Sequence, residues 1–209
     1  MVRQRVRIRF CKQGDLRLIG HRDLVRSMER LFRRAGLRLG MSEGFHPKPR
    51  MSFPSALALG IEGLDEVMEL ELAEEYTSEE LLRRLASCAV PGLEFKSVRL
   101  LPPGTRKAQL RRATYRVPVP AERRAEAADR TARLMAESSC PVQRPNHSDP
   151  IDLRPFLEQL TLREGVLTMR LEPGPQRSAG PRDVLAALGM ADLETQGVHI
   201  TRATVELQP

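Results

Sequence analysis

The first ten residues restrict the fold most, because apolar and basic side chains alternate along them. The even positions are mostly apolar and include Val6, Ile8 and Phe10, whereas the odd positions from 3 to 9 are all arginine. A period of two residues predicts a β-strand with one face in a core. The other face of that strand carries Arg3, Arg5, Arg7 and Arg9.

The remainder of the first half predicts a helix, two strands, a helix and a strand. Residues 21–37 carry apolar side chains three or four positions apart, which is the pattern of an amphipathic helix. Strands are predicted near residues 51–59, 67–72 and 93–100, and Thr77 or Ser78 can cap a helix that reaches residue 89. The order β-α-β-β-α-β is that of a ferredoxin-like domain.

The second half repeats this order. Strands are predicted near residues 113–119, 151–162, 166–171 and 198–207, with helices near 121–137 and 181–188. Pro102-Pro103-Gly104 is typical of a linker. We therefore expect an α+β protein of two tandem ferredoxin-like domains with mainly antiparallel sheets, at residues 1–101 and 107–209.

Composition excludes several classes of protein. The charged start is unlike a signal peptide, and no run approaches the roughly 18 apolar residues of a membrane span. Cys11, Cys88 and Cys140 are far apart, and no CxxC motif is present, so neither zinc nor an iron–sulfur cluster is indicated. We expect a soluble, cytoplasmic protein without a metal, a cofactor or a membrane contact.

The charge favours an anionic partner. The formal net charge is +7, and Arg greatly outnumbers Lys. Arg binds phosphate well because its planar guanidinium can donate two parallel hydrogen bonds. The arginine face of the first strand could thus form a phosphate-binding ladder. Alternatively, Glu69 and Glu71 of a neighbouring strand could pair with it, or a second sheet could cover it. The aromatic platform of RNA-recognition motifs is missing.

The first predicted helix adds a second basic surface. Four arginines recur three or four positions apart along it: Arg22, Arg26, Arg30 and Arg33. This spacing forms a continuous ridge, for which the alternative is a solvated face with local pairing of Glu29 and Arg33.

The segment after this helix is the best candidate for a site. It combines glycine, two prolines, a histidine, two cations and two aromatic residues, namely Gly44, Phe45, His46, Pro47, Lys48, Pro49, Arg50, Ser52 and Phe53. A stiff loop with Lys48 and Arg50 suits an anion. His46, or His21 beside Asp23, could act as an acid or base, although Asp23 is also explained by the helix dipole. The turn at residues 146–149 is interpreted as structural, and no complete catalytic motif is present.

The N-terminal half resembles a known bacterial family. The segments that carry the likeness are Arg9–Arg26, Arg33–Leu37, Ser42–Phe53 and Ala56–Gly60, and in the second half Ile151–Pro155. They are similar to the radical-SAM-linked proteins, a domain of unknown function encoded beside or fused to a radical SAM protein. Arg22 stands where the family pattern has an apolar residue. The resemblance implies a radical SAM partner, which must perform any radical chemistry because this chain lacks CxxxCxxC.

These observations together predict an accessory module that binds RNA, either tRNA or rRNA, and works with a separate radical SAM enzyme. Two alternatives remain open. One is an RNA-processing or RNA-modifying enzyme that uses His46 or His21 as acid or base. The other is a protein-binding adaptor of the radical SAM partner without RNA contact.

Overall fold

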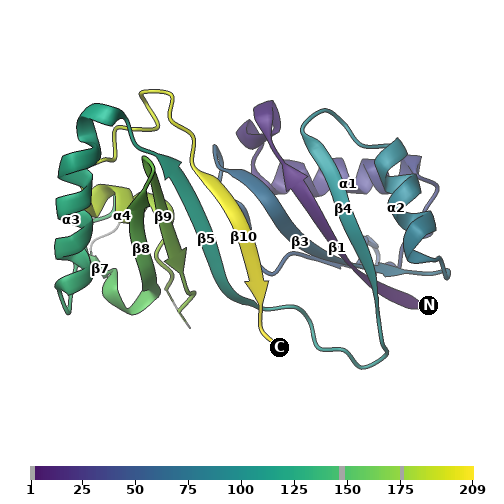
Figure 1. Ribbon diagram of the computed structural model, residues 1–209. Helices are drawn as coiled ribbons and strands as arrows, with labels where there is room; N and C mark the ends of the chain where they lie inside the picture. Colours follow the sequence, from purple (N-terminus) through teal and green to yellow (C-terminus); the bar gives the residue numbers. More distant parts are fainter. Residues whose placement is uncertain (1–2, 146–148, 175–176) are drawn as a thin grey trace. The chain divides into compact units, whose positions relative to one another are not determined.

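The computed structural model describes residues 3–145, 149–174 and 177–209 (Figure 1). The chain folds into two compact units. One unit comprises Met1–Gln109 with Leu207–Pro209, and the other comprises Leu110–Glu206. The chain is a mixed α/β protein with mainly antiparallel strands, and its described residues contain four α-helices. None of the helices in these ranges is both long and apolar enough to cross a membrane.

The first unit places two helices on one face of an antiparallel sheet. Its elements are β1 (Gln4–Lys12), α1 (His21–Arg34), β2 (Met51–Ser52), β3 (Glu62–Leu72), α2 (Ser78–Ser87) and β4 (Leu93–Leu101), with a 3-10 helix at Gly14–Leu18. The strands lie in the order β4-β1-β3, and β2 pairs with β3. Val6, Ile8 and Phe10 are buried and share one core with residues of both helices, as their alternation predicts. The arginines of β1 therefore lie on the sheet face away from the helices.

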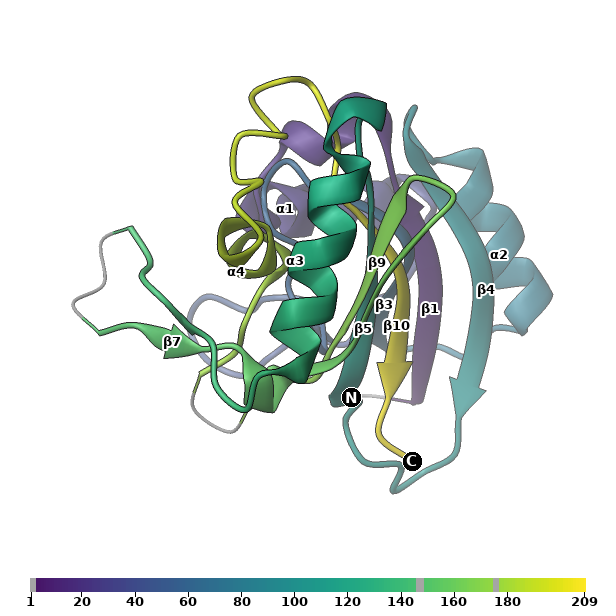
Figure 2. The same cartoon turned by 60° about the vertical axis from the view of Figure 1, so that its left-hand side comes forward.

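The second unit has a similar succession of elements. It contains β5 (Leu110–Pro118), α3 (Arg124–Ala136), β8 (Leu157–Arg163), β9 (Val166–Leu171), α4 (Pro181–Ala187) and β10 (Thr201–Leu207). The strand order is β10-β5-β9-β8, and α3 and α4 lie on the same side of β5, β8 and β9 (Figure 2). The remaining elements are the 3-10 helices Ala121–Arg123 and Arg154–Phe156 and the small antiparallel pair β6 (Pro141–Val142) and β7 (Ile151–Asp152).

Several element boundaries differ from those expected, and three of these differences have a local physical cause. Helix α1 ends at Arg34 because Gly36 adopts a φ of 66° and the amide of Leu37 donates to the carbonyl of Phe32, which closes a Schellman motif. The strand expected over residues 51–59 is only two residues long, since Pro54 cannot donate to a ladder. The strand expected over residues 151–162 is divided by a 3-10 turn that contains Pro155.

Candidate nucleic-acid interface

The exposed side of α1 presents the predicted arginine ridge. Leu24, Met28, Leu31 and Phe32 are the buried residues of this helix. The ridge side chains are exposed and comprise Arg22, Arg26, Arg30 and Arg33. Arg26 contacts Asp23 at 3.5 Å and Arg33 contacts Glu29 at 3.7 Å, but both arginine side chains are 69% exposed, so these pairs contribute little and leave the guanidiniums accessible.

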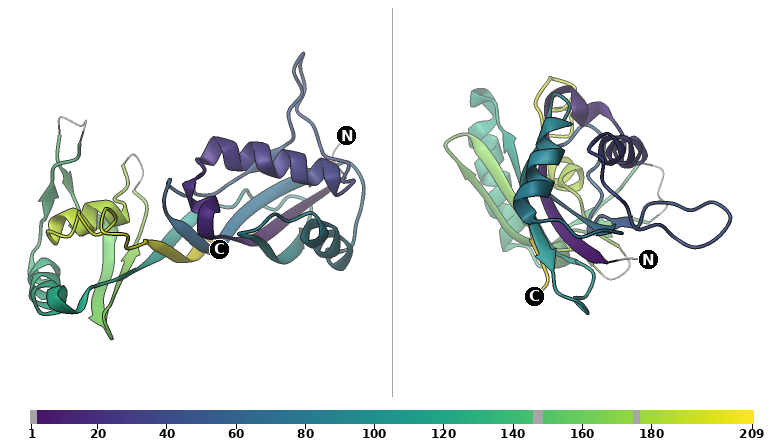
Figure 3. Two further views of the ribbon diagram at one scale, coloured as in Figure 1. Left: turned by 90° about the horizontal axis from the view of Figure 1, so that it is seen from above. Right: turned by 90° about the vertical axis from the view of Figure 1, so that its right-hand side faces the viewer.

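The loop that follows α1 is closed at its base. Met41 and Pro49 form an isolated bridge, and the amide of Arg50 donates to the carbonyl of Gly40 at 2.8 Å. The amide of Ser42 donates to the carbonyl of Lys48 at 2.8 Å, and the Ser42 hydroxyl accepts from the amide of Lys48 at 3.0 Å. Figure 3 shows the resulting narrow projection, which stands out from the unit beside α1.

The structure divides the nine predicted loop residues among three places. Gly44, Phe45 and His46 form the exposed tip, where Gly44 has a φ of 111° and Phe45 is fully exposed. The residues Pro47, Lys48 and Pro49 return toward α1. The last three are part of the folded sheet and its core: Arg50 contacts Glu71 at 3.5 Å, Ser52 is in β2, and Phe53 packs on the core.

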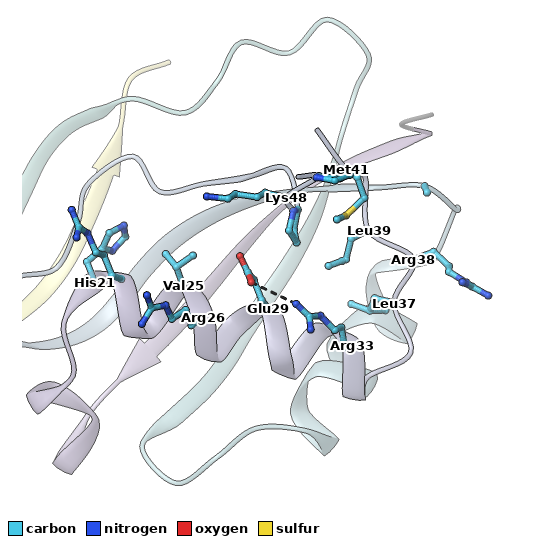
Figure 4. A pocket seen from close by; sticks show the side chains of 14 residues that line it. His21, Val25, Arg26, Glu29, Arg33, Leu37, Arg38, Leu39, Met41 and Lys48 are labelled. Carbon is cyan, nitrogen blue, oxygen red and sulfur yellow. Dashed lines mark ion pairs between the residues drawn. The ribbon is translucent and has the colours of Figure 1, made fainter. Parts of the chain in front are cut away.

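A groove of about 730 Å³ lies between α1 and the segment 37–49 (Figure 4). Its apolar lining comes from Val25, Leu37, Leu39, Met41, Pro47, Pro49 and Ala73. Five lysine and arginine side chains also line it, namely Arg22, Arg26, Arg33, Arg38 and Lys48, and the one carboxylate of the lining is Glu29. Two further carboxylates form exposed pairs with these cations from outside the lining: Asp23 lies 3.5 Å from Arg26, and Glu74 lies 3.8 Å from Arg38. Helix α1 and the loop that follows it thus form one cationic surface, and its excess of positive charge attracts polyanions.

His21 lies at one end of this groove with an unusual environment. Its ring meets Phe53 edge to face at a centroid distance of 5.0 Å, and its Nδ1 atom is buried without a hydrogen-bond partner in the described structure. Burial, with a smaller contribution from the nearby Lys12 charge, lowers the pKa of His21, so the imidazole is neutral at pH 7. Asp23 forms an ion pair with Arg26, and no hydrogen bond or ion pair joins it to His21 in the described structure. The acid–base pairing considered for His21 and Asp23 is therefore not assembled.

The arginine face of β1 is largely paired with carboxylates of β3. Arg7 lies opposite Glu69 in register and contacts it at 2.8 Å, while Arg5 contacts the same carboxylate at 3.0 Å. Arg9 forms an ion pair with Asp65. Arg3 is exposed and has no carboxylate partner within the described ranges. Arg5, Arg7 and Arg9 are therefore less available to phosphate than the arginines of α1.

Sequence reasoning missed part of the groove. Arg38 and the apolar residues Leu37, Leu39 and Met41 line it together with the predicted residues. The alternation Leu37-Arg38-Leu39 is the available signal, since Leu39 bridges to Leu72 of β3 and Arg38 is exposed. The motif at residues 146–149 lies mostly outside the described residues.

The Ile151–Pro155 segment of the second half has a structural role in the small sheet. The carboxylate of Asp152 accepts the amides of Cys140 at 2.7 Å and Arg154 at 3.1 Å, and these bonds lower the pKa of Asp152. The Arg154 guanidinium in turn donates to the carbonyls of Glu137 and Leu157. In the parts of the chain that are described, no group of three or more His, Cys, Asp or Glu side chains could hold a metal ion.

Fold and surface thus define a basic mixed α/β protein with an elongated cationic groove in its first unit. The chain belongs to the family described as an uncharacterized protein conserved in bacteria (DUF2344), whose model matches residues 5–181. No curated protein matches the sequence.

Proposed function

We propose that this protein is an accessory RNA-binding module and that the groove between α1 and the segment 37–49 receives the RNA backbone. The observation that supports this proposal is the charge of the groove, whose lining holds five cations and one carboxylate, while Asp23 and Glu74 form only exposed pairs with Arg26 and Arg38. Partial pairing of the β1 arginines with Glu69 and Asp65 makes the groove a better candidate than the sheet face.

The length of the cationic array favours a polymer over a compact anion. Arg22 and Arg33 lie eleven positions apart on one helix, which corresponds to about 16.5 Å at 1.5 Å per residue. Lys48 faces this row from the loop (Figure 4). A nucleic-acid strand presents phosphates at regular intervals over such a distance, whereas a single phosphate contacts only one end.

The spatial order of the strands within each unit supports a finer description of the fold as two ferredoxin-like domains. In the first unit the order β4-β1-β3 with β2 on β3 matches the fourth, first, third and second strands of that fold. The order β10-β5-β9-β8 matches it in the second unit. This description leaves one face of the first sheet without helices, which is the face that carries the β1 arginines.

The proposed partner is a radical SAM enzyme, as the family resemblance implies, and the proposed RNA is tRNA or rRNA. The chain would hold the RNA while the partner performs the reaction. Copurification of the two proteins, with and without ribonuclease treatment, tests whether they contact each other directly or only through RNA.

The test of RNA binding is a salt series with bulk tRNA and rRNA. The groove variant combines Arg22→Gln, Arg26→Gln and Lys48→Gln. The control variant combines Arg83→Gln, Arg116→Gln and Arg163→Gln and removes the same charge. These three arginines are exposed and form no ion pair within the described part of the chain. The slope of log K against log salt is negative, and we expect its magnitude to decrease by about 2 in the groove variant, at roughly 0.7 for each lost contact with a single strand.

Two results would favour the alternatives. A folded wild type that binds the radical SAM partner but no RNA would favour the protein adaptor. Cleavage or modification of RNA by the chain alone, abolished by His46→Ala or His21→Ala, would favour the enzyme. Equal loss of RNA affinity in groove and control variants would contradict the assignment to the groove.

A further inference from the structure

A second cationic cavity lies on the face of the first sheet that α1 and α2 leave uncovered. It has a volume of about 610 Å³ and is lined by parts of β1 and β4, by the segment 101–109 and by Gln208 and Pro209. Its charged lining residues are Arg7, Arg99, Arg106 and Lys107. No aspartate or glutamate side chain is among the lining residues, so every charged side chain of the cavity wall is a cation.

The segment that closes this cavity is held in place by several hydrogen bonds. The amide and hydroxyl of Thr105 both donate to the carbonyl of Pro102, at 3.2 and 2.6 Å. Arg5, which projects from the sheet, donates to the carbonyl of Thr105 at 2.5 Å. The amide of Gln208 donates to the carbonyl of Gln109 at 2.9 Å. Arg106 and Lys107 are therefore presented by a fixed backbone.

The cations of the cavity are incompletely neutralised. Arg7 lies directly opposite Arg99 in the pairing of β1 with β4, an arrangement that is unfavourable for like charges. Arg7 shares Glu69 with Arg5, and it uses Nε and Nη2 for this contact. Arg99, Arg106 and Lys107 have no carboxylate partner among the residues described. An anion bound between them would relieve the repulsion that the protein itself leaves unbalanced.

We propose that this cavity binds a terminal phosphate group, supplied either by a free nucleotide or by the 5′ end of an RNA. A phosphate monoester carries nearly two negative charges and three acceptor oxygens, which suits several converging guanidinium and ammonium groups. The cavity volume falls within the range of small-molecule sites. This inference does not depend on the groove at α1, because the two sites share no residue.

The test compares ligands that differ only in the phosphate. Calorimetry measures the binding of adenosine 5′-monophosphate and of adenosine, and fluorescence anisotropy measures a 3′-labelled short RNA with a 5′-phosphate or a 5′-hydroxyl. We expect the wild type to bind the phosphorylated member of at least one pair about tenfold more tightly, as one lost charged hydrogen bond typically corresponds to that factor. Preference in both pairs identifies the phosphate group alone as the ligand, and preference only in the RNA pair identifies the RNA end as its source.

The variant Arg99→Gln/Lys107→Gln is expected to lose this preference, whereas Arg83→Gln/Arg116→Gln, which removes the same charge elsewhere, keeps it. Melting temperatures establish that both variants are folded. The groove variant at α1 should lose affinity for all RNAs while it retains the preference for the phosphate, which separates failure of this inference from failure of the proposed function. Equal binding of both members in both pairs by the wild type, or equal loss of preference in the control, would overturn the proposal.

Discussion

Glu69 is expected to be one of the most sensitive charged positions for the stability of the first unit. It is 4% exposed, lies on β3 and accepts three hydrogen bonds from two guanidiniums: from Arg5 at 3.0 Å and from Arg7 at 2.8 and 3.2 Å. Those arginine side chains are only 22% and 19% exposed, so water replaces the lost carboxylate poorly. We expect Glu69→Gln to lower the free energy of unfolding by about 3 kcal/mol, the lower end for breaking a buried ion pair.

The assay is urea unfolding followed by far-ultraviolet circular dichroism. Glu29→Gln is the matched control, because Glu29 pairs with Arg33 at 3.7 Å and that arginine is 69% exposed. The control should lose only about 0.3 kcal/mol, which is typical of an exposed pair within a helix. Equal losses in the two variants, or a loss below about 0.5 kcal/mol for Glu69→Gln, would refute the assignment of a structural role to the paired arginines.

Three further predictions concern other parts of the chain. Because burial lowers the pKa of His21, the unfolded chain binds a proton at this residue more readily than the folded chain as the pH falls toward and below about 6.5. The wild type should therefore lose more stability between pH 7.5 and 5.5 than His21→Gln, measured as urea midpoints. Equal losses in the two proteins would contradict this prediction. Phe45→Ala should weaken RNA binding by about 1 kcal/mol at every salt concentration without changing the salt slope, if the exposed ring stacks on a base; an unchanged affinity would exclude stacking. Asp152→Ala should cost about 1 kcal/mol at pH 7, and the difference from the wild type should disappear as acid protonates Asp152, which thermal melts across pH would reveal.

Local patterns in the sequence were sufficient to predict most elements of the first unit. The alternation around Val6, Ile8 and Phe10 predicts a strand with one buried face, and the structure has that strand at β1. Thr77 was one of two possible caps for α2, and its hydroxyl accepts the amide of Glu80 at 3.1 Å. Such features depend on neighbours within a few residues, so they can be predicted from the local sequence alone.

Features that depend on tertiary contacts are harder to predict from the sequence. The short strands β6 and β7 pair Val142 with Ile151, and strands of two residues are too short to produce a periodic pattern in the sequence. The pairing of Arg5 and Arg7 with Glu69 was one of several alternatives, because the register between β1 and β3 decides it. Arg38 belongs to the groove only because the loop folds back toward α1.

The most direct test of the central claim is to map where RNA lies on the protein. A short RNA with a 5′-hydroxyl and scattered 4-thiouridines is cross-linked to the wild type by ultraviolet light, and the cross-linked peptides are identified by mass spectrometry. The account predicts cross-links concentrated in α1 and in residues 37–49, and their loss in the variant Arg22→Gln/Arg26→Gln/Lys48→Gln. Cross-links confined to β1, β4 or residues 110–206, or a pattern that the triple variant leaves unchanged, would contradict it.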